Sequence, residues 1–445
     1  MLSVPMVSRH LQHLLTTTAD AAGEETGCIQ RTRRFRGATL CQTLVFGWLG
    51  APAATLDQLC QMAAVCGVRI TPQGLAQRCT RATASMLHQV LTAAVEHVLS
   101  TDPVAIPLLQ RFCGVYLQDC TTITLPPALA DCWSGCGDGT ADGRTAVLKA
   151  GVRFDLAGGT LHGPVLAAGR THDRTVVAAL PSLPPGSLRL ADLGFFSLTD
   201  LAAQDTAGCF WLTRVQMGTA LFDASGRRWE LADLVEEVVT GLTDLAVTVG
   251  VTHRLACRLL AVPVPDTVAN QRRRRMHEEA HRRGVMVTAD RLRLAAFTVF
   301  LTNVPADRLL PQEALVLARA RWQIEILFKC WKSVGQVDQW RSQLADRILC
   351  EVYAKLIGLV LQHWILLIAG WDDPRRSLMK ASAAVRAAAV ALALALRRPG
   401  RLTQTLRDLA GSLQAGCRKN TRHGKLNTEQ LLLHPERNHE LPHAA

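Results

Sequence analysis

The sequence lacks an uninterrupted apolar run of the roughly 20 residues that a membrane-spanning helix needs. Two stretches near the C-terminus, 356–370 and 381–396, are the most apolar, but Gln362 and His363 interrupt the first and Arg386 the second. A positively charged start followed by an apolar segment, which marks a secretion signal, is also missing. We therefore expect buried helices in these stretches and no membrane partner.

Cysteine pairs with metal-ligand spacing are missing as well. The chain has 14 cysteines but no CxxC pair, and a reducing cytoplasm is the simpler inference from such scattered thiols. Cys132 and Cys136 lie four positions apart, but no second pair with suitable spacing lies nearby. We therefore expect no zinc site there.

The chain does contain enough apolar residues for a large core, and it carries an excess of positive charge. Its 445 residues are 49% hydrophobic, which predicts a globular protein of about two to four domains. Lys and Arg number 49 against 37 Asp and Glu, a formal net charge of +12. This excess favours a polyanionic partner, although a ribosome-associated or membrane-surface protein has a similar balance.

The N-terminal residues 1–107 show helical patterns. One helix is predicted from the capping residue Thr55 to Gly67, and Pro72 opens a second whose apolar residues recur at helical spacing to Val98. A helix, a glycine-containing turn and a second helix are typical of the helix-turn-helix, whose second member enters a DNA major groove. The same pattern also fits a plain helical hairpin. We predict a helical domain that binds DNA.

From Gly114 the pattern changes to short β-like runs separated by glycine-rich turns. Two adjacent runs meet at 155–159, which predicts a hairpin. Later runs alternate with helices, so the fold class is α/β, a mixed sheet flanked by helices. The predicted strands are 114–118, 146–154, 160–168, 187–191, 209–215 and 296–303, with a helix near 175–180.

Residues 216–295 read as a β-rich insertion with runs at 246–252 and 256–264. It also contains a run of four arginines. The run either binds a phosphate backbone, which makes binding strongly salt-dependent, or forms the solvated face of a short helix. The four residues are Arg272, Arg273, Arg274 and Arg275.

After the insertion the chain is mainly helical. A long helix is predicted at 311–332, residues 342–412 are largely helical, and the tail from Arg418 is basic and polar. We therefore predict a C-terminal region at 341–445, made of helices and a basic tail.

Two aspartates stand where predicted strands end. Asp119 closes the run that begins at Val115, and Asp192 closes the run that begins at Leu188. A strand fixes the direction of such a carboxylate while its tip stays open, so it is well placed to hold a divalent cation. The alternatives are a turn residue for Asp119 and a helix cap for Asp192.

A glutamate in the predicted helix 311–332 is the third candidate acid. At about 100° per residue, Arg321, Glu325 and Lys332 share one narrow face of the helix. An apolar stripe about 110° away would pin the helix against a sheet and turn the charged face into a cleft. A solvated, salt-bridged face is the alternative. The stripe consists of Ile324, Leu327, Phe328 and Trp331.

Three acids on separate elements suit phosphodiester chemistry. Two Mg²⁺ ions about 3.5 to 4 Å apart can activate the attacking oxygen and stabilise the leaving oxygen, and carboxylates are the ligands that Mg²⁺ prefers. Arg321 and Lys332 would then contact phosphates of the DNA strand that is cut.

These residues together resemble bacterial insertion-sequence transposases of the DDE superfamily, in particular the insertion-sequence-four family. The resemblance covers about 110–335. It rests on Asp119-Cys-Thr with Leu125-Pro126, Ala191-Asp-Leu-Gly-Phe195, the spacing of Arg321, Glu325 and Lys332, and the segments Arg170-Thr-His-Asp173 and Leu301-Thr-Asn-Val-Pro305.

The resemblance implies a ribonuclease-H-like catalytic core at 108–340, with the β-rich insertion at about 216–295. It implies Asp119, Asp192 and Glu325 as catalytic and metal-binding residues, with Mg²⁺ or Mn²⁺ in a two-metal site. It also implies that a homodimer cuts transposon terminal inverted repeats and joins them to target DNA, in the bacterial cytoplasm at the nucleoid. Trp322 matches the family's tryptophan and is expected to contact DNA.

Three positions depart from the family pattern. Ala318 stands where the family has tyrosine, Leu193 replaces an arginine and Cys120 replaces a serine. The lost tyrosine affects DNA handling rather than the metals. It also suggests an alternative, a catalytically inactive DNA-binding protein derived from a transposase, which the presence of all three acids disfavours. A third hypothesis is a metal nuclease that cuts without strand transfer.

Overall fold

The computed structural model describes residues 2–31, 34–136, 145–369, 371, 373–420 and 426–440. They form two compact units, and each unit contains several stretches of the chain. Positions 421–425 and 441–445 of the predicted basic tail lie outside the described residues. The first unit consists of Met1–Val104, Asp119–Pro181 and Gln323–Asn420, and the second of Ala105–Gln118, Ser182–Trp322 and Thr421–Ala445.

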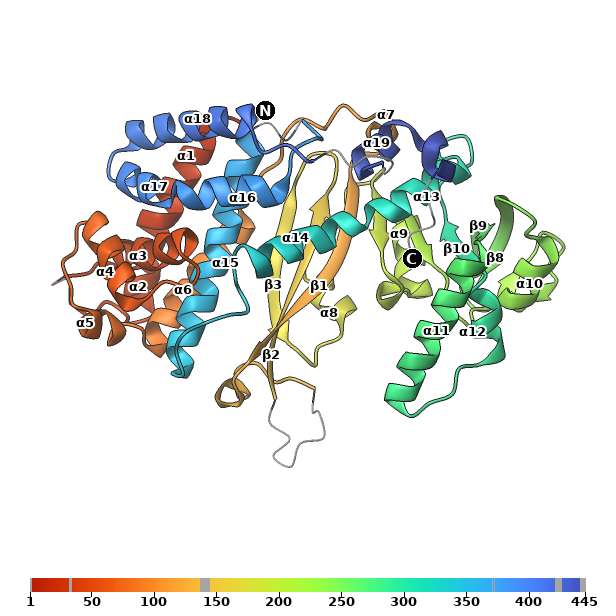
Figure 1. Cartoon of the computed structure of the whole chain (residues 1–445), viewed down its shortest axis with the longest axis horizontal. Helices are drawn as coiled ribbons and strands as arrows, with labels where there is room; N and C mark the ends of the chain where they lie inside the picture. The colour runs from red at the N-terminus through yellow and green to blue at the C-terminus, as the bar shows by residue number, and fades with distance from the viewer. Residues whose placement is uncertain are drawn as a thin grey trace. The chain divides into compact units, whose positions relative to one another are not determined.

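The first unit is mainly helical and brings the N-terminal helices together with helices from the last quarter of the chain (Figure 1). The N-terminal α1 packs against α18 near the C-terminus, and α15 packs against α3 and α6. The helices are α1 (Val4–His13), the π-helix η1 (Leu14–Thr18), α2 (Ala19–Glu25), α3 (Gly37–Gly50), α4 (Leu56–Val65), α5 (Pro72–Ala76), α6 (Arg81–Glu96), the 3₁₀ helix η2 (Pro127–Leu129), α8 (Asp173–Ala178), α14 (Trp322–Ser333), α15 (Ala345–Ile368), α16 (Leu378–Ala387), α17 (Ala389–Leu396) and α18 (Pro399–Ala415).

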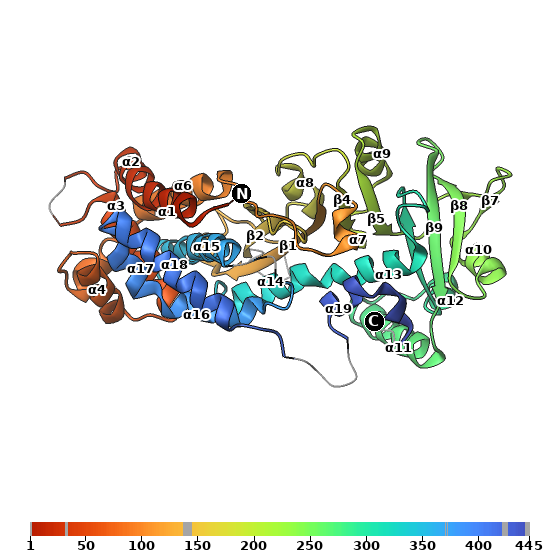
Figure 2. The same ribbon diagram turned by 90° about the horizontal axis from the view of Figure 1, so that it is seen from above.

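The second unit is built on a sheet with helices beside it (Figure 2). Its strands are the first residues of β1 (Val115–Leu125), β4 (Leu188–Ala191), β5 (Phe210–Arg214), β6 (Leu221–Phe222), β7 (Arg228–Trp229), β8 (Thr243–Val249), β9 (Leu255–Pro263) and β10 (Phe297–Thr302). Its helices are α7 (Pro107–Gln110), η3 (Leu193–Phe195), α9 (Leu198–Thr206), α10 (Leu231–Val238), α11 (Asp266–Arg283), α12 (Ala289–Leu294), α13 (Pro311–Ala320), α19 (Thr428–Leu433) and η4 (Pro435–Glu440).

The sheet is mixed, as predicted for an α/β protein. Over the described residues its strand order is β3-β2-β1-β4-β5-β10-β9-β8-β6-β7. β1, β4 and β5 run parallel, whereas β5, β10, β9 and β8 are antiparallel neighbours. In the first unit β2 (Ala146–Asp155) and β3 (Leu161–Ala168) form the predicted antiparallel hairpin.

The segment 216–295 is continuous with this sheet. β9 pairs with β10 on one side and with β8 on the other, so the strands of the insertion extend the sheet. Trp211, Leu259 and Leu301 belong to one buried cluster that joins the two parts. The segment also contains α10, α11 and α12; the sequence offered a helix only for the arginine run, as one alternative and as a short one, whereas α11 has 18 residues.

The second helix predicted at the N-terminus is interrupted. α4 begins after Thr55, whose hydroxyl accepts a hydrogen bond from the N–H of Gln58 (3.3 Å), as its cap role predicts. α5 begins at Pro72 but has only five residues. One continuous helix from there to Val98 was therefore wrong, because Thr80 caps a new helix, α6, by accepting from the backbone of Thr83.

The long helix predicted at 311–332 is also two helices, α13 and α14. The break falls at Arg321, which adopts helical dihedrals but ends α13. The single helical wheel used to align Arg321 with Glu325 and Lys332 therefore applies within α14 alone.

α15 is the longest helix and is apolar enough to cross a membrane by length and composition. In the structure 94% of its apolar window is buried, so it is a core helix of the first unit. It begins at Ala345, well before the apolar stretch 356–370 that predicted it. α16 and α17 pass the same test only as a pair bent by 54°.

Candidate active site

In the register of β1 and β4, the first two candidate acids follow the same pair of residues. The two strands run parallel, and Gln118 is the Cα partner of Ala191 in the last pair. The next residue is Asp119 in one strand and Asp192 in the other. Two acids thus follow one paired position of adjacent parallel strands.

Asp119 does not end its strand, contrary to the sequence prediction. β1 continues to Leu125. The extension follows from alternation with a period of two, because Thr121, Ile123 and Leu125 are buried and the residues between them are exposed. Asp119 is half-buried, and its Oδ1 accepts a hydrogen bond from the N–H of Cys120 (2.8 Å).

Asp192 directly follows β4, as predicted. Its Oδ1 accepts from the N–H of Leu193 (2.7 Å), and it caps the short helix η3. The cap role considered from the sequence is therefore real. It leaves Oδ2 without a protein partner among the described residues, so the cap and a metal-binding role are compatible.

Glu325 lies in the first turn of α14 and is half-buried. Cys330 on the same helix donates a hydrogen bond from Sγ to Oγ of Ser382 in α16 (3.0 Å), which holds α14 in the first unit. The predicted apolar stripe is buried, as expected: its members are Ile324, Leu327, Phe328 and Trp331.

Two of the three predicted DNA-contacting residues near Glu325 lie with it on α14, and the third lies at the break before this helix. Lys332 shares α14 with Glu325 and is half-buried. Trp322 begins α14 and is 57% exposed, which is unusual for a tryptophan. Arg321 is half-buried at the break between α13 and α14.

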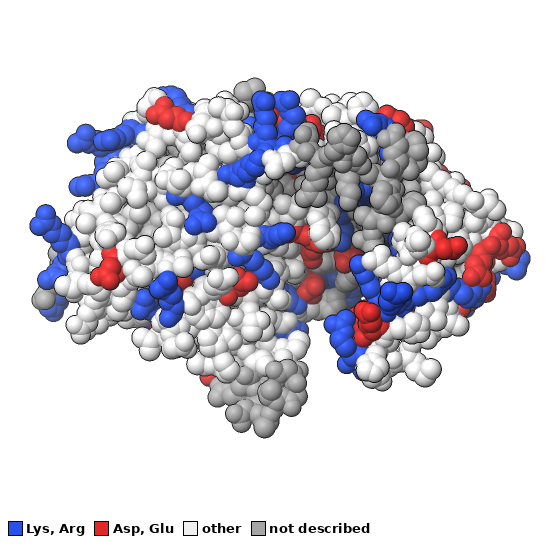
Figure 3. Space-filling view, viewed as in Figure 1, with Lys and Arg blue, Asp and Glu red and all other residues white. Residues whose placement is uncertain are grey.

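The arginine run lies on α11, an 18-residue helix over which Lys and Arg side chains gather (Figure 3). Arg272 is half-buried and donates to the carbonyl oxygen of Phe297 (2.9 Å) and to Oγ1 of Thr298 (3.0 Å). Burial lowers the pKa of its guanidinium.

Of the other three arginines in the run, one also binds a protein acceptor and two are exposed. Arg273 donates to the carbonyl oxygen of Leu292 (3.0 Å), so it also ties α11 to its own unit. Arg274 and Arg275 are exposed. Neither predicted role covers Arg272 and Arg273, which bind protein acceptors; the two predicted roles, phosphate binding or a solvated helix face, remain for Arg274 and Arg275.

Lys149 on β2 is a buried charged residue that the sequence analysis missed. Its Nζ donates to the carbonyl oxygen of Thr171 and to Oδ1 of Asp173, both at 2.6 Å. Cys120 Sγ lies 3.9 Å from the carbonyl oxygen of Asp173. These contacts place the Arg170–Asp173 segment beside the residue that follows Asp119. A lone lysine within an apolar strand was the available signal.

Burial also determines the state of Cys120, which stands where the family pattern has serine. It raises the pKa of this thiol to about 12, with Asp173 and Asp119 adding to the effect. Cys120 is therefore a neutral thiol beside the candidate site at physiological pH, and all 14 cysteines of the chain are free.

The candidate acids match a divalent metal in ligand type. Carboxylate oxygens are hard donors of the kind that Mg²⁺ prefers. No group of three or more His, Cys, Asp or Glu side chains with a metal-binding arrangement occurs within the described ranges. The fit therefore rests on donor chemistry and on the paired strand positions of Asp119 and Asp192.

Comparisons with known proteins agree with this chemistry. Residues 114–361 match a family model described as the transposase DDE domain. The transposase for insertion sequence element IS231B from Bacillus thuringiensis subsp. berliner is 26% identical over 374 residues, 79% of this chain and 77% of the relative.

Two further relatives come from other bacteria. The transposase for insertion sequence element IS1151 from Clostridium perfringens is 24% identical over 276 residues, 57% of both chains. The putative transposase InsL for insertion sequence element IS186A from Escherichia coli (strain K12) is 27% identical over 183 residues, 39% of this chain and 50% of the relative.

The fold, the candidate acids and these similarities define an enzyme that acts on DNA. The family model covers more than half of the chain, and the chain belongs to the DDE transposase family. Its function is DNA transposition, and dependence on a divalent metal is general in this family.

Proposed function

We propose that Asp119, Asp192 and Glu325 are the catalytic residues of this enzyme and that they hold two Mg²⁺ or Mn²⁺ ions. The observation that carries the proposal is the register in which Gln118 pairs with Ala191, because an acid follows each of them. The strand order β3-β2-β1-β4-β5 supports a ribonuclease-H-like core, with β1 and β4 at its centre.

The reaction is cleavage of transposon-end DNA followed by strand transfer into target DNA. Metal ions held by Asp119, Asp192 and Glu325 would activate the attacking oxygen and neutralise charge on the phosphate. The protein's task is to hold the three carboxylates in place. β1 and β4 fix the backbone at Asp119 and Asp192, and the buried stripe of α14 fixes Glu325.

We propose DNA contacts for two groups of side chains: those near Glu325 that match the family pattern, and the exposed part of the arginine run. Arg321, Trp322 and Lys332 are assigned to the strand that is cut, with Trp322 free to stack on a base. Within the arginine run, the exposed Arg274 and Arg275 are the better phosphate ligands. Arg272 and Arg273 already donate to protein acceptors.

We further propose terminal inverted repeats as the recognised DNA and a homodimer as the active form. Named relatives are transposases of bacterial insertion sequences, so the bacterial cytoplasm at the nucleoid is the expected place of action. The predicted domains, 1–107 for DNA binding, 108–340 for catalysis and 341–445 for dimer contacts, belong to this proposal.

The test is cleavage of labelled DNA that carries the flanking terminal repeats, with Mg²⁺. Wild type is compared with Asp192→Asn and Glu325→Ala, and with Glu237→Gln as a control for an exposed acid on α10. We expect wild type and the control to nick at the repeat ends. The two site variants should bind the same DNA without cutting it.

The alternatives give different results in the same assay. Wild type that binds repeats without cutting under any metal would identify the inactive DNA-binding protein. Cutting without joined products or a synaptic complex would identify a metal nuclease. Cleavage that survives Glu325→Ala would remove that residue from the catalytic set.

A further inference from the structure

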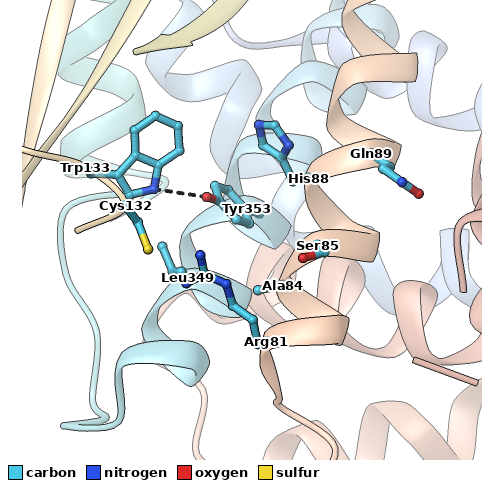
Figure 4. Close-up of a pocket in the computed structure, with 9 residues that line it drawn as sticks. All are labelled: Arg81, Ala84, Ser85, His88, Gln89, Cys132, Trp133, Leu349 and Tyr353. Atoms are coloured by element: carbon cyan, nitrogen blue, oxygen red, sulfur yellow. Dashed lines mark hydrogen bonds between the residues drawn. The ribbon is translucent and has the colours of Figure 1, made fainter. Parts of the chain in front are cut away.

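A pocket of about 340 Å³ lies within the first unit, and none of the candidate acids lines it (Figure 4). Volumes from about 300 Å³ are typical of ligand sites. One wall is a polar face of α6, another is α15, and the third is the segment that leads into β2. The lining residues are Arg81, Ala84, Ser85, His88, Gln89, Cys132, Trp133, Leu349 and Tyr353.

Aromatic rings dominate one side of the pocket. The ring of His88 lies 5.2 Å from Tyr353 and 6.5 Å from Trp133, between centroids. Trp133 is held in place by its backbone, because its carbonyl oxygen accepts from the N–H of Val147 (2.8 Å). The residue is half-buried and lines the pocket. A pocket-lining indole with a fixed backbone offers a surface on which a base can stack.

Tyr353 supplies a directed hydrogen-bond donor. It is 5% exposed, and its hydroxyl oxygen accepts the indole N–H of Trp133 (3.1 Å). Burial raises the pKa of Tyr353 to about 12, so the phenol keeps its proton. Because Trp133 occupies the oxygen as an acceptor, the hydroxyl hydrogen is available to a ligand acceptor.

Arg81 supplies the positive charge of the pocket. It is exposed at the start of α6, and a hydrogen bond with Cys132 raises the pKa of its guanidinium, with a smaller effect of Asp346. Burial lowers the pKa of His88, so the imidazole is neutral near pH 7. The pocket thus offers one cation, one buried hydroxyl and aromatic faces.

We propose that this pocket binds a single unstacked nucleotide of a DNA strand. The base lies against Trp133, and its polar edge or phosphate meets Arg81 and the Tyr353 hydroxyl. Every base has a face that stacks on an aromatic ring, and arginine pairs with phosphate or with base edges. The inference rests on the proposed function only in taking DNA as the partner.

Binding of two fluorescein-labelled octamers in EDTA tests the proposal. One is single-stranded oligothymidine, and the other has the same phosphates with abasic sugars. We expect wild type to bind oligothymidine more tightly than the abasic strand. Trp133→Ala should lose between about fivefold and about a hundredfold of affinity for oligothymidine and little for the abasic strand.

Two milder variants and two controls keep the test independent of folding. Tyr353→Phe keeps the ring and removes the hydroxyl, and Arg81→Gln removes the charge; both should weaken oligothymidine binding severalfold. Thr92→Ala, on an exposed position of α6, and Trp371→Phe, which packs on Phe154 outside the pocket, should leave both affinities unchanged.

Each outcome decides the proposal. Equal wild-type affinity for the two octamers would overturn it, since the protein would then bind the DNA backbone alone. Thymidine monophosphate binding as tightly as the octamer would also overturn it, in favour of a free nucleotide. Repeat-end cleavage by the same preparations separates the two proposals: cleavage without base preference rejects the pocket alone, and base preference without cleavage rejects the catalytic assignment alone.

Discussion

α15 in the first unit and α11 in the second differ in the burial of their charged residues. α15 has 24 residues and buries Glu351 and Lys355, whose side chains are 3% and 2% exposed and lie 2.8 Å apart. α11 has 18 residues, and its buried residues are Ala269 and Ala280. Its charged side chains are exposed, bound to nearby acceptors, or paired at the surface, as Arg283 is with Glu279 (2.7 Å).

The comparison shows that the surroundings determine whether a charged side chain binds other parts of the protein or faces solvent. Lys355 Nζ also donates to the carbonyl oxygens of Gln336 (3.0 Å) and Gln339 (2.7 Å), so all three of its hydrogens are used. These bonds fasten the turn after α14 to α15. In α11 the positive charge of Arg274 is exposed to solvent.

The largest expected change in the free energy of unfolding comes from disrupting the buried ion pair of α15. Lys355→Met leaves Glu351 as a buried charge without its cation, and we expect a loss of about 3 to 5 kcal/mol in the free energy of unfolding. Urea unfolding measures it, with the exposed Lys329→Met of α14 as the control. Adding Glu351→Leu to Lys355→Met should recover part of the loss. A single variant as stable as wild type would contradict the role of the pair.

The next largest effect is a pH dependence of the free energy of unfolding, which we expect from His363 on α15. Burial lowers its pKa from 6.5 to about 4, and its Nε2 lies 2.7 Å from the carbonyl oxygen of Gly159. The folded state favours the neutral ring, so its contribution is complete above pH 6.5 and is lost as the pH falls toward about 4. The total is up to about 3 kcal/mol.

The measurement is the free energy of unfolding of wild type and His363→Gln between pH 7.5 and about 4. Their difference isolates this histidine from other titrating groups. It should shrink as the pH falls, and a constant difference would show that His363 does not titrate in this range.

Within α11, Arg272 should matter more for stability than its exposed neighbour. Arg272→Ala leaves acceptors at Phe297 and Thr298 unpaired, and we expect a loss of about 1 to 3 kcal/mol. Arg274→Ala should change stability by less than about 0.5 kcal/mol. Thermal unfolding of both variants checks this, and equal losses would refute the division of the run.

The smallest effect on stability is expected for Arg274→Gln combined with Arg275→Gln, whose consequence appears in DNA binding. If both contact phosphates, the slope of log affinity against log salt should fall by about two. Titration of duplex DNA at several salt concentrations measures this slope. A slope equal to that of wild type would leave these arginines as a solvated helix face.

Much of the fold could be predicted from local patterns. The strand before Asp192, the β2-β3 hairpin and the helix capped by Thr55 carry turn or capping residues that act on their immediate neighbours. The breaks before α6 and at Arg321 were missed, because apolar periodicity continues across them. Lys149 stood out as a lone lysine in an apolar strand, but its partner Asp173, 24 residues later, was not predictable from the sequence.

The amino-acid order was enough to predict the family and the mixed sheet, and it selected the three acids that we propose as catalytic, since spacing and alternation are properties of the chain itself. It was not enough to tell which arginines of α11 are structural, or which residues line the pocket that contains Trp133. Burial and hydrogen bonding depend on which distant segments meet. Arg272 and Arg274 are two positions apart, yet only one of them finds carbonyl partners in its fold.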